Sequence, residues 1–306
     1  MADMATQPET VAAGVRYPLG AEGPLERWGR GLLHFVRRKP LGAFGGLLIL
    51  VVLLTALLGG LAAPHGYDEI DLSQRFLRPS LSHPFGTDDQ GRDILSRVIY
   101  GARTSVVVSF SAVAIATLLS TTIGMVSGYR AGRFDLFAQR FIDIWQAFPG
   151  LIFVVFVISI FGKGVPVLIV TLGLLLSAGA SRVVRSATFA VCAHPYIDAA
   201  RALGAGDLRI LCYHVLPNVL PVVLVNLSVQ VGAVILIESA LSFLGFGVPP
   251  PFPSWGRMLQ DAQRFMQSYP HLALFPGLAI ALTVYGFNML GDALRDVLDP
   301  RLRGGP

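Results

Sequence analysis

Apolar residues along the chain gather in long runs, and polar segments rich in charge, proline or glycine separate these runs. A helix that crosses the hydrocarbon core of a bilayer needs roughly 20 mostly apolar residues. Six runs come close to this length or exceed it, which predicts an all-α, polytopic membrane protein with six transmembrane helices. The predicted spans cover residues 41–63, 105–128, 144–161, 165–181, 219–237 and 272–290.

The composition agrees with a membrane protein in a lipid bilayer. Of the 306 residues, 53% are hydrophobic and 14% are charged, whereas a soluble domain has about 25% charged residues. The first apolar run begins late and is long for a cleaved signal peptide, which favours a retained membrane anchor. The segment before it is polar, and we expect an N-terminal tail over residues 1–36.

Lysine and arginine in the connecting segments predict the orientation of the spans, because cytoplasmic loops carry an excess of both. The basic residues concentrate in the segments that an N-inside, six-span topology places in the cytoplasm. The loop between the first two runs instead balances arginines such as Arg92 and Arg97 with acidic residues such as Asp88. The net charge of +5 therefore requires no nucleic-acid partner. The cytoplasmic group comprises Arg27, Arg30, Arg37, Arg38, Lys39, Arg130, Arg133, Arg140, Arg182, Arg185, Arg201, Arg209, Arg295, Arg301 and Arg303.

The polar segment between the fourth and fifth runs has the pattern of two short helices joined at a glycine. Pro195 suits the first turn of a helix, and alanine-rich residues continue it to Leu203. Gly204 fits the left-handed position that ends a helix. Asp207 is placed to cap the second helix.

This segment resembles the "EAA" coupling loop of ABC importer permeases. The pattern stands here as Asp198-Ala199-Ala200, Gly204 and Leu216-Pro217 with the family spacing. Two residues depart from it, because Asp198 replaces glutamate and His214 replaces an apolar residue. The resemblance implies that the loop docks on a cytoplasmic ATPase; the alternative is an ordinary amphipathic cytoplasmic loop. The implied coupling residues are Tyr196, Asp198, Ala199, Ala200, Leu203, Gly204, Leu216 and Pro217.

Three further segments resemble the dipeptide/oligopeptide/nickel branch of these permeases, and in particular its C-type subunit. They are the segment from His83 to Asp93, the segment from Glu238 to Gly256, and the tail over residues 291–303. The first is rich in aspartate, but a calcium loop counted from Asp88 would need glycine and glutamate where Asp93 and Ile99 stand. The resemblance covers about residues 37–303.

The resemblance implies the type I fold of ABC importer permeases and an assembly around it. It implies a cytoplasmic tail at 1–36, the first helix and outer loop at 37–100, a five-helix core at 101–293 with a coupling loop at 186–217, and a cytoplasmic tail at 294–306. The implied location is the inner (plasma) membrane, with both termini in the cytoplasm. The implied partners are a second, B-type permease, two ATP-binding subunits that hold ATP and Mg, and an extracytoplasmic solute-binding protein.

Two residues near the predicted outer end have open interpretations. Glu238 lies near the end of the fifth run, and an ionisable group there either faces a water-filled pathway or is a paired or solvated carboxylate. It is our candidate for a translocation-pathway residue. Trp255 follows a run of prolines, and its side chain suits a membrane interface.

Motifs for catalysis are missing from the sequence. There is no phosphate-binding loop, and the only lysines, Lys39 and Lys163, lie outside any such motif. Cys192 and Cys212 form two Cys-x-His pairs with neighbouring histidines, but ordinary thiols explain them better than zinc does. We therefore expect a non-catalytic subunit with no cofactor or metal of its own. A self-contained secondary transporter is the alternative, although no clear internal repeat supports it. Peptides, nickel complexes, glutathione-like molecules and sugars all remain open as substrates.

Overall fold

The computed structural model describes residues 35–298, and the chain divides into two units, Met1–Arg38 and Lys39–Pro306. Residues 35–38 are the described part of the first unit, and they are helical. Most of the expected N-terminal tail, and the basic residues Arg301 and Arg303, lie outside the described residues. All further description concerns the second unit.

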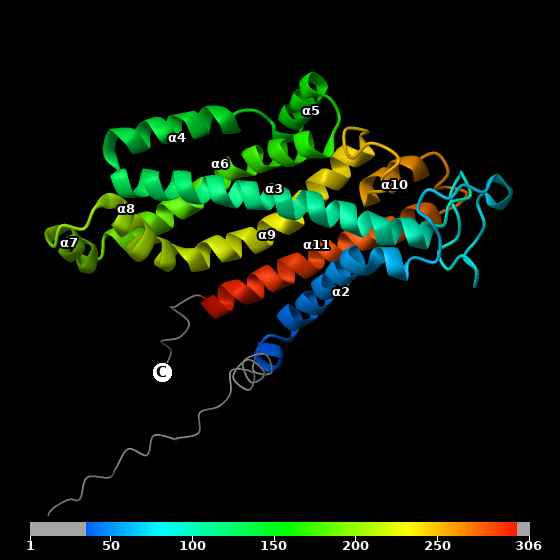
Figure 1. Ribbon diagram of the computed structural model, residues 1–306, viewed down its shortest axis with the longest axis horizontal. Helices are drawn as coiled ribbons and strands as arrows, with labels where there is room; N and C mark the ends of the chain where they lie inside the picture. Colours follow the sequence, from blue (N-terminus) through cyan, green and yellow to red (C-terminus); the bar gives the residue numbers. More distant parts are fainter. Residues whose placement is uncertain (1–34, 299–306) are drawn as a thin grey trace, which may run out of the picture. The chain divides into compact units, whose positions relative to one another are not determined.

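Between residues 39 and 298 the structure consists of helices and loops, without a β-strand (Figure 1). A short 3-10 turn, η1, lies in the loop after the first helix, and a π-helical segment, η2, precedes α9. The elements in chain order are α2 (Pro40–Ala62), η1 (Leu72–Gln74), α3 (Ile94–Arg130), α4 (Gly132–Gln146), α5 (Gly150–Phe161), α6 (Val165–Cys192), α7 (Pro195–Ala202), α8 (Asp207–Arg209), η2 (Ile210–Val215), α9 (Leu216–Phe243), α10 (Trp255–Ala262) and α11 (His271–Leu298).

Five of the six predicted spans correspond to single long apolar helices in the described structure. They are α2, α3, α6, the helical stretch Asp207–Phe243 that ends with α9, and α11. Most of these helices are longer than the apolar runs, because polar residues continue them beyond the hydrophobic part. At the start of α3, for example, the Asp93 side chain caps the helix by accepting a hydrogen bond from the Ser96 amide at 2.8 Å.

The predicted third span over residues 144–161 is not one continuous helix. The chain forms two helices there, α4 and α5, which meet at an angle of 81° and count as one span only as a bent pair. Pro149 lies at the bend, where it lacks a backbone N–H and disfavours helical geometry at Phe148. The polar face of α4 also has partners, because Asp135 pairs with Arg185 and Asp143 pairs with Arg182 of α6.

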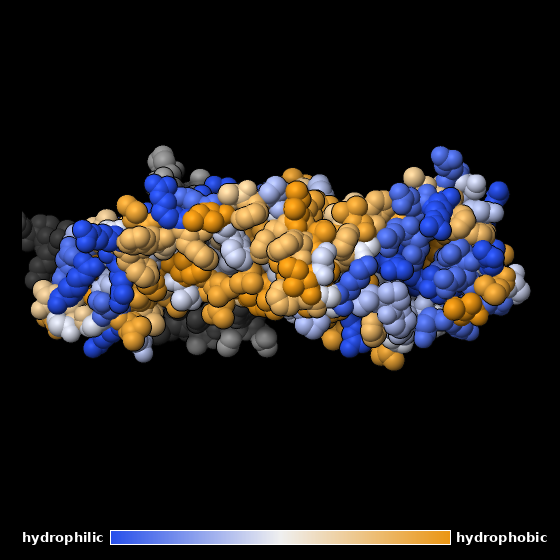
Figure 2. Space-filling model, turned by 90° about the horizontal axis from the view of Figure 1, so that it is seen from above, coloured by the Kyte–Doolittle hydropathy of each residue, from blue (hydrophilic) through white to orange (hydrophobic). Residues whose placement is uncertain are grey.

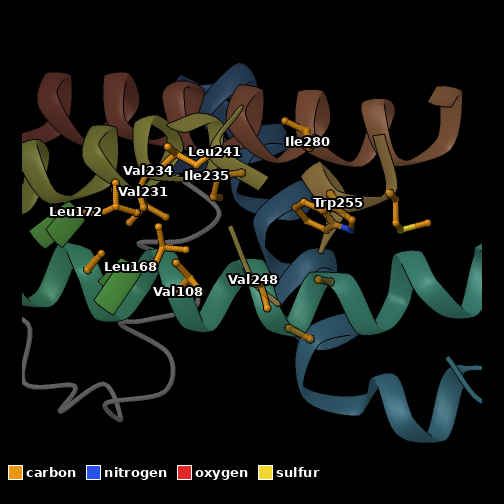
Figure 3. Close-up of a cluster of buried hydrophobic side chains, with 14 of the residues drawn as sticks. Val108, Leu168, Leu172, Val231, Val234, Ile235, Leu241, Val248, Trp255 and Ile280 are labelled. Atoms are coloured by element: carbon orange, nitrogen blue, oxygen red, sulfur yellow. The ribbon is translucent and has the colours of Figure 1, made fainter. Parts of the chain in front are cut away.

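The core of the helix bundle lies where α3, α6, α9 and α11 meet. Figure 3 shows side chains from these helices pointing toward one another, with Val108 of α3 near Leu168 of α6 and Val231 of α9. All three side chains are 1% exposed or less. Trp255 of α10 and Val248 of the preceding loop close one end of this core.

Small residues let α3 and α6 approach closely along their length. A Cβ atom added to Gly124 of α3 would lie 2.6 Å from the Ser181 carbonyl oxygen, and one added to Gly173 of α6 would lie 2.8 Å from Ile115 Cβ. Helices in a bilayer associate largely through this kind of close van der Waals packing, because lipid tails are as apolar as the side chains.

The surface of the unit is divided by polarity in the way that a bilayer requires. Figure 2 shows hydrophobic residues over the middle of one face and hydrophilic residues gathered at both ends. Large apolar side chains are exposed on the helices, including Leu57 at 80% and Leu61 at 89% on α2. Exposed apolar surface of this extent is stable against lipid and not against water.

We expect Gly124→Val to destabilise the bundle by about 1–3 kcal/mol, because a larger side chain at a close-packed contact forces the backbones apart. Gly277→Val is the matched control, since Gly277 is also helical and an added Cβ there meets nothing within 4 Å. Thermal unfolding of the purified variants in one detergent measures the effect. Equal melting temperatures for the two variants would contradict the packing argument.

Candidate functional site

The segment between α6 and α9 folds as a short helix, α7, that ends at a glycine. Pro195 occupies the first turn of α7, as predicted, and Gly204 follows the helix with φ of 82°. The Ala205 amide donates to the Ala200 carbonyl at 3.0 Å, and the Gly204 amide donates to the Arg201 carbonyl at 2.9 Å. These two bonds form a Schellman motif, which satisfies the last carbonyls of the helix.

The predicted capping role of Asp207 was wrong. Gly206 is the capping residue of α8 and makes no side-chain cap, while Asp207 is the first helical residue. The Asp207 carboxylate instead accepts a hydrogen bond from the Tyr129 hydroxyl of α3 at 2.9 Å. The chain then continues through η2 instead of a regular second helix, next to Pro217, which lacks an N–H for the usual helical bond.

One side chain anchors α7 to the bundle. Ile197 is fully buried in a small apolar cluster that also contains Met125 of α3, Val184 of α6 and Val219 of α9. Ile197 therefore joins α7 to an apolar cluster to which three long helices contribute, and a rigid displacement of α7 would act on this cluster.

The opposite face of α7 is open, and most of the predicted coupling residues lie on it or next to it. Leu203 is 90% exposed, and the Asp198 side chain is 74% exposed beside Arg201. The exposed members of the predicted set are Tyr196, Asp198, Ala199, Leu203, Gly204 and Pro217, and the half-buried members are Ala200 and Leu216.

A second contact joins α7 to α3, and the sequence gave no local signal for it. The Arg201 guanidinium lies over the Tyr129 ring, 5.0 Å from its centroid. The hydrogen bond to Tyr129 raises the pKa of Arg201 above its ordinary value. Together with the bond between Tyr129 and Asp207, this contact ties the loop to the end of α3 on both sides of Gly204.

The histidines of the loop pack on an aromatic ring. Tyr196 lies 5.8 Å from His194 and 6.4 Å from His214, measured between ring centroids. His214, which departs from the family pattern, therefore contacts Tyr196 in place of an apolar side chain. Within residues 35–298, Cys192 and Cys212 do not converge with these histidines on a common metal position.

Glu238 lies at the opposite end of the bundle and is fully buried. The Ser242 hydroxyl donates to Glu238 Oε1 at 2.6 Å, and the Ser105 hydroxyl of α3 lies 3.5 Å from Oε2. Of the two interpretations of this carboxylate, the structure favours the paired one, with serine hydroxyls as the partners. The side chain does not face open space in the described structure.

The segment that follows α9 folds back over its end. A Cβ added to Gly247 would lie 1.7 Å from Ser242 Oγ, so only glycine fits there. Trp255 is 2% exposed, and its indole nitrogen donates to the Val98 carbonyl at 2.9 Å. The indole of Trp255 is therefore packed inside the bundle and not on its surface, because Gly101 leaves room for it against α3.

Charged residues of the α2–α3 loop (residues 63–93) and Arg97 of α3 form a cluster with α10. Arg97 is 4% exposed and lies 3.2 Å from Asp88 and 3.6 Å from Asp261, while Arg92 lies 2.7 Å from Asp88. Burial raises the pKa of the neighbouring Asp89 carboxyl, with a smaller contribution from the Asp88 charge. Asp261 is distant in sequence, so its part in this cluster had no signal in the sequence.

Comparisons with known proteins settle what kind of molecule this bundle is. The family described as binding-protein-dependent transport system inner membrane component matches residues 120–304. The N-terminal transmembrane domain of oligopeptide transport permease C matches residues 28–79. The chain belongs to the ABC importer permease family.

Relatives resemble the permease over most of its length. The dipeptide transport system permease protein DppC of Alkalihalophilus pseudofirmus is 38% identical over 88% of both chains. The glutathione transport system permease protein GsiD of Pectobacterium atrosepticum is 37% identical over 87% of this chain and 89% of its own.

Solved structures share the fold. Inward-facing conformations of the MetNI methionine ABC transporter match with a TM-score of 0.55 at 16% identity, over 66% of this chain and 96% of that chain. An amino acid ABC transporter crystallised with histidines matches with a TM-score of 0.51 at 18% identity, over 66% of this chain and 94% of that chain. The predicted type I permease fold and the inner-membrane nature of the chain are thereby confirmed, and permeases of this family act together with ATPase subunits.

We expect Gly204→Ser to weaken the end of α7 by about 1–2 kcal/mol, because its left-handed backbone disfavours any Cβ. An added Cβ at Gly204 meets no neighbouring atom, so backbone strain alone would cause the effect. Gly206→Ser is the control, since Gly206 has φ of −70° and serine is favoured at a helix cap. Hydrogen exchange of residues 199–205 should accelerate in the first variant only, and similar exchange in both would contradict this account.

Proposed function

We propose that the permease forms half of a transmembrane pathway for the uptake of a peptide or a related solute, driven by separate ATP-binding subunits that dock on α7. The observation that carries this proposal is the exposed face of α7, which a single buried anchor, Ile197, joins to the long helices. ATP and Mg would be bound by those partner subunits.

A peptide-like substrate is supported by the relatives, whose names assign them to dipeptide and glutathione transport. Glutathione is itself a small peptide, so both relatives act on solutes with peptide bonds and carboxylates. A nickel importer or another solute importer of the same family is the alternative. A secondary transporter that works alone is the less favoured one.

The end of the bundle that carries α7 would face the cytoplasm. Arg201 and Arg209 lie in the α7 loop, and Arg182 and Arg185 lie on the nearby part of α6. The start of α2 and the end of α11 lie on the same side of the bundle, where Lys39 pairs with Asp296 (Figure 1). Cytoplasmic segments are enriched in lysine and arginine, so this charge distribution supports cytoplasmic termini. The opposite end would then receive solute from an extracytoplasmic binding protein.

Coupling would act through the two attachments of the loop. A closing pair of ATPase subunits would displace α7, and the buried Ile197 would transfer this displacement to the ends of α3, α6 and α9. The contacts of Tyr129 with Arg201 and Asp207 would keep the loop and the end of α3 in register during the movement.

A second permease would complete the pathway. An apolar groove runs between α3, α4 and α6, and its lining includes Phe137, Phe141 and Trp145. Phe137 and Phe141 are 72% and 66% exposed. We assign this aromatic face of α4 to contact with the B-type permease, since one chain would supply only half of a two-fold pathway.

Cysteine labelling of intact cells tests the orientation. Cys212 is exposed in the α7 loop and Ser268 is exposed at the opposite end. With Cys192 replaced by serine, we expect an impermeant thiol reagent to label Cys212 only after permeabilisation. A Ser268→Cys variant without the two native cysteines should be labelled in intact cells. The reverse pattern would overturn the orientation.

Reconstitution in liposomes tests the energy source. The chain alone should neither hydrolyse ATP nor take up solute, whereas the assembly with both permeases and the ATPases should do both. Gly204→Val should uncouple the assembly, with uptake lost at least about tenfold while assembly is retained, and Gly206→Ser should transport normally. Uptake by the chain alone under an ion gradient would refute the importer-subunit proposal, and normal uptake by Gly204→Val would refute the lever role of α7.

A further inference from the structure

Two histidines and an aspartate from the α2–α3 loop lie close together near the end of α2 and the start of α3. His83 Nδ1 lies 3.0 Å from Asp93 Oδ1, and His65 Nδ1 lies 3.9 Å from Asp93 Oδ2. All three ligand atoms lie within 4.8 Å of one another, and the two imidazole rings are stacked with centroids 4.7 Å apart. The three side chains come from segments that the fold brings together, so no short sequence motif announces them.

The hydrogen bonds around His83 leave one of its nitrogen atoms facing a carboxylate. The Gln74 amide nitrogen donates to Asp71 at 2.8 Å, which turns the Gln74 carbonyl oxygen toward His83 Nε2 at 2.9 Å. With the Gln74 oxygen as the acceptor, His83 Nε2 is the donor of this hydrogen bond. His83 Nδ1 faces the Asp93 carboxylate at 3.0 Å, which is close enough for a direct hydrogen bond or for a cation that both side chains bind.

The remaining partners of the cluster are fixed. Asp93 Oδ2 accepts from both the amide and the hydroxyl of Ser96 at 2.8 Å, so the carboxylate is held in place by its role as the α3 cap. The side chains of His83 and Asp93 are 9% and 1% exposed. His65 Nδ1 is buried and has no hydrogen-bond partner in the structure, although the His65 side chain as a whole is 34% exposed. That exposed edge provides a route of entry to the cluster.

From this geometry we propose that His65, His83 and Asp93 bind a divalent transition metal ion of the zinc type, with water as the fourth ligand. Two imidazoles with one carboxylate suit such ions, whereas Ca²⁺ and Mg²⁺ prefer an all-oxygen shell. Ligand atoms about 2.1 Å from a tetrahedral zinc ion lie roughly 3.4 Å apart. His83 Nδ1 lies 3.0 Å from Asp93 Oδ1, and the three ligand atoms all lie within 4.8 Å of one another, so a small inward movement of the side chains would complete the site. Gln74 acts as the outer partner that orients His83.

The bound ion would join three parts of the permease that the backbone leaves separate. His65 follows the end of α2, His83 lies in the middle of the α2–α3 loop, and Asp93 caps the start of α3. Metal binding would therefore hold the α2–α3 loop against α2 and α3, at the end of the bundle opposite α7.

Zinc titration of the purified full-length permease tests the proposal. The protein is prepared without a histidine tag and with Cys192 and Cys212 changed to serine, and Zn²⁺ is titrated against a fluorescent chelator. We expect one Zn²⁺ per chain and slower hydrogen exchange of residues 80–94 when it is bound. His65→Ala and Asp93→Asn should each lower the affinity at least about tenfold, which is the smallest effect expected even for an outer-shell partner.

The variants separate ligand loss from loss of folding. Asparagine caps helices as well as aspartate does, so Asp93→Asn keeps the start of α3. His65→Ala removes a side chain that makes no hydrogen bond through Nδ1. His194→Ala, at the other end of the bundle, is the control and should leave the affinity unchanged. Failure of the parent protein to bind zinc stoichiometrically, equal affinity in the His65 variant, or equal competition by Ca²⁺ would overturn the proposal, and the contact between His83 and Asp93 would then be a direct hydrogen bond only.

Discussion

The close approach of α3 and α6 is the contact on which the rest of the permease depends. Glycines at Gly124 and Gly173 bring the two backbones together, and in a bilayer this packing replaces the hydrophobic effect as the cause of association. Because α3 is held in this way, it can serve both ends of the molecule. At one end it supplies Tyr129 to the α7 loop, and at the other it supplies Ser105 to the buried Glu238.

The apolar surroundings of the helices also determine how polar groups are accommodated. Within apolar surroundings an unpaired charge is costly, so each charged side chain in the described bundle that is deeply buried has partners close at hand. Arg97 has two carboxylates, and Glu238 has serine hydroxyls. Both of these polar clusters lie toward the end of the bundle opposite α7, which leaves its middle to the apolar core shown in Figure 3. The arrangement allows stable insertion without removing ionisable groups from the places where the chain must bind partners.

The sequence predicted what depends on local composition and missed what depends on contacts between distant segments. Long apolar runs predicted α2, α3, α6, α9 and α11, because length and apolarity suffice to insert a helix. The left-handed backbone of Gly204 was also predictable, because the conformational preference of glycine is local. The bend at Pro149 was missed because the apolar pattern continues through it.

Contacts across the bundle were beyond the reach of the sequence. Tryptophan is a residue type that suits a membrane interface, and only the contact of Trp255 with Gly101 and Val98 of α3 shows that it is buried. Asp207 has the type and position of a cap, and only the proximity of Tyr129 gives its carboxylate another partner. In the candidate site, the exposed coupling residues could be named from their motif, but the side chains that attach the loop to the helices could not.

The buried charge cluster has a consequence for how the permease is made. Asp261 belongs to α10, so during synthesis it emerges long after α3 has left the ribosome. Until then Arg97 would enter the membrane with one of its two carboxylates missing. Asp88 lies only nine positions before Arg97 and bonds to it directly, so a local partner accompanies the arginine from the start. Asp88 can thus pair with Arg97 during insertion, and Asp261 of α10 adds a second carboxylate in the finished fold.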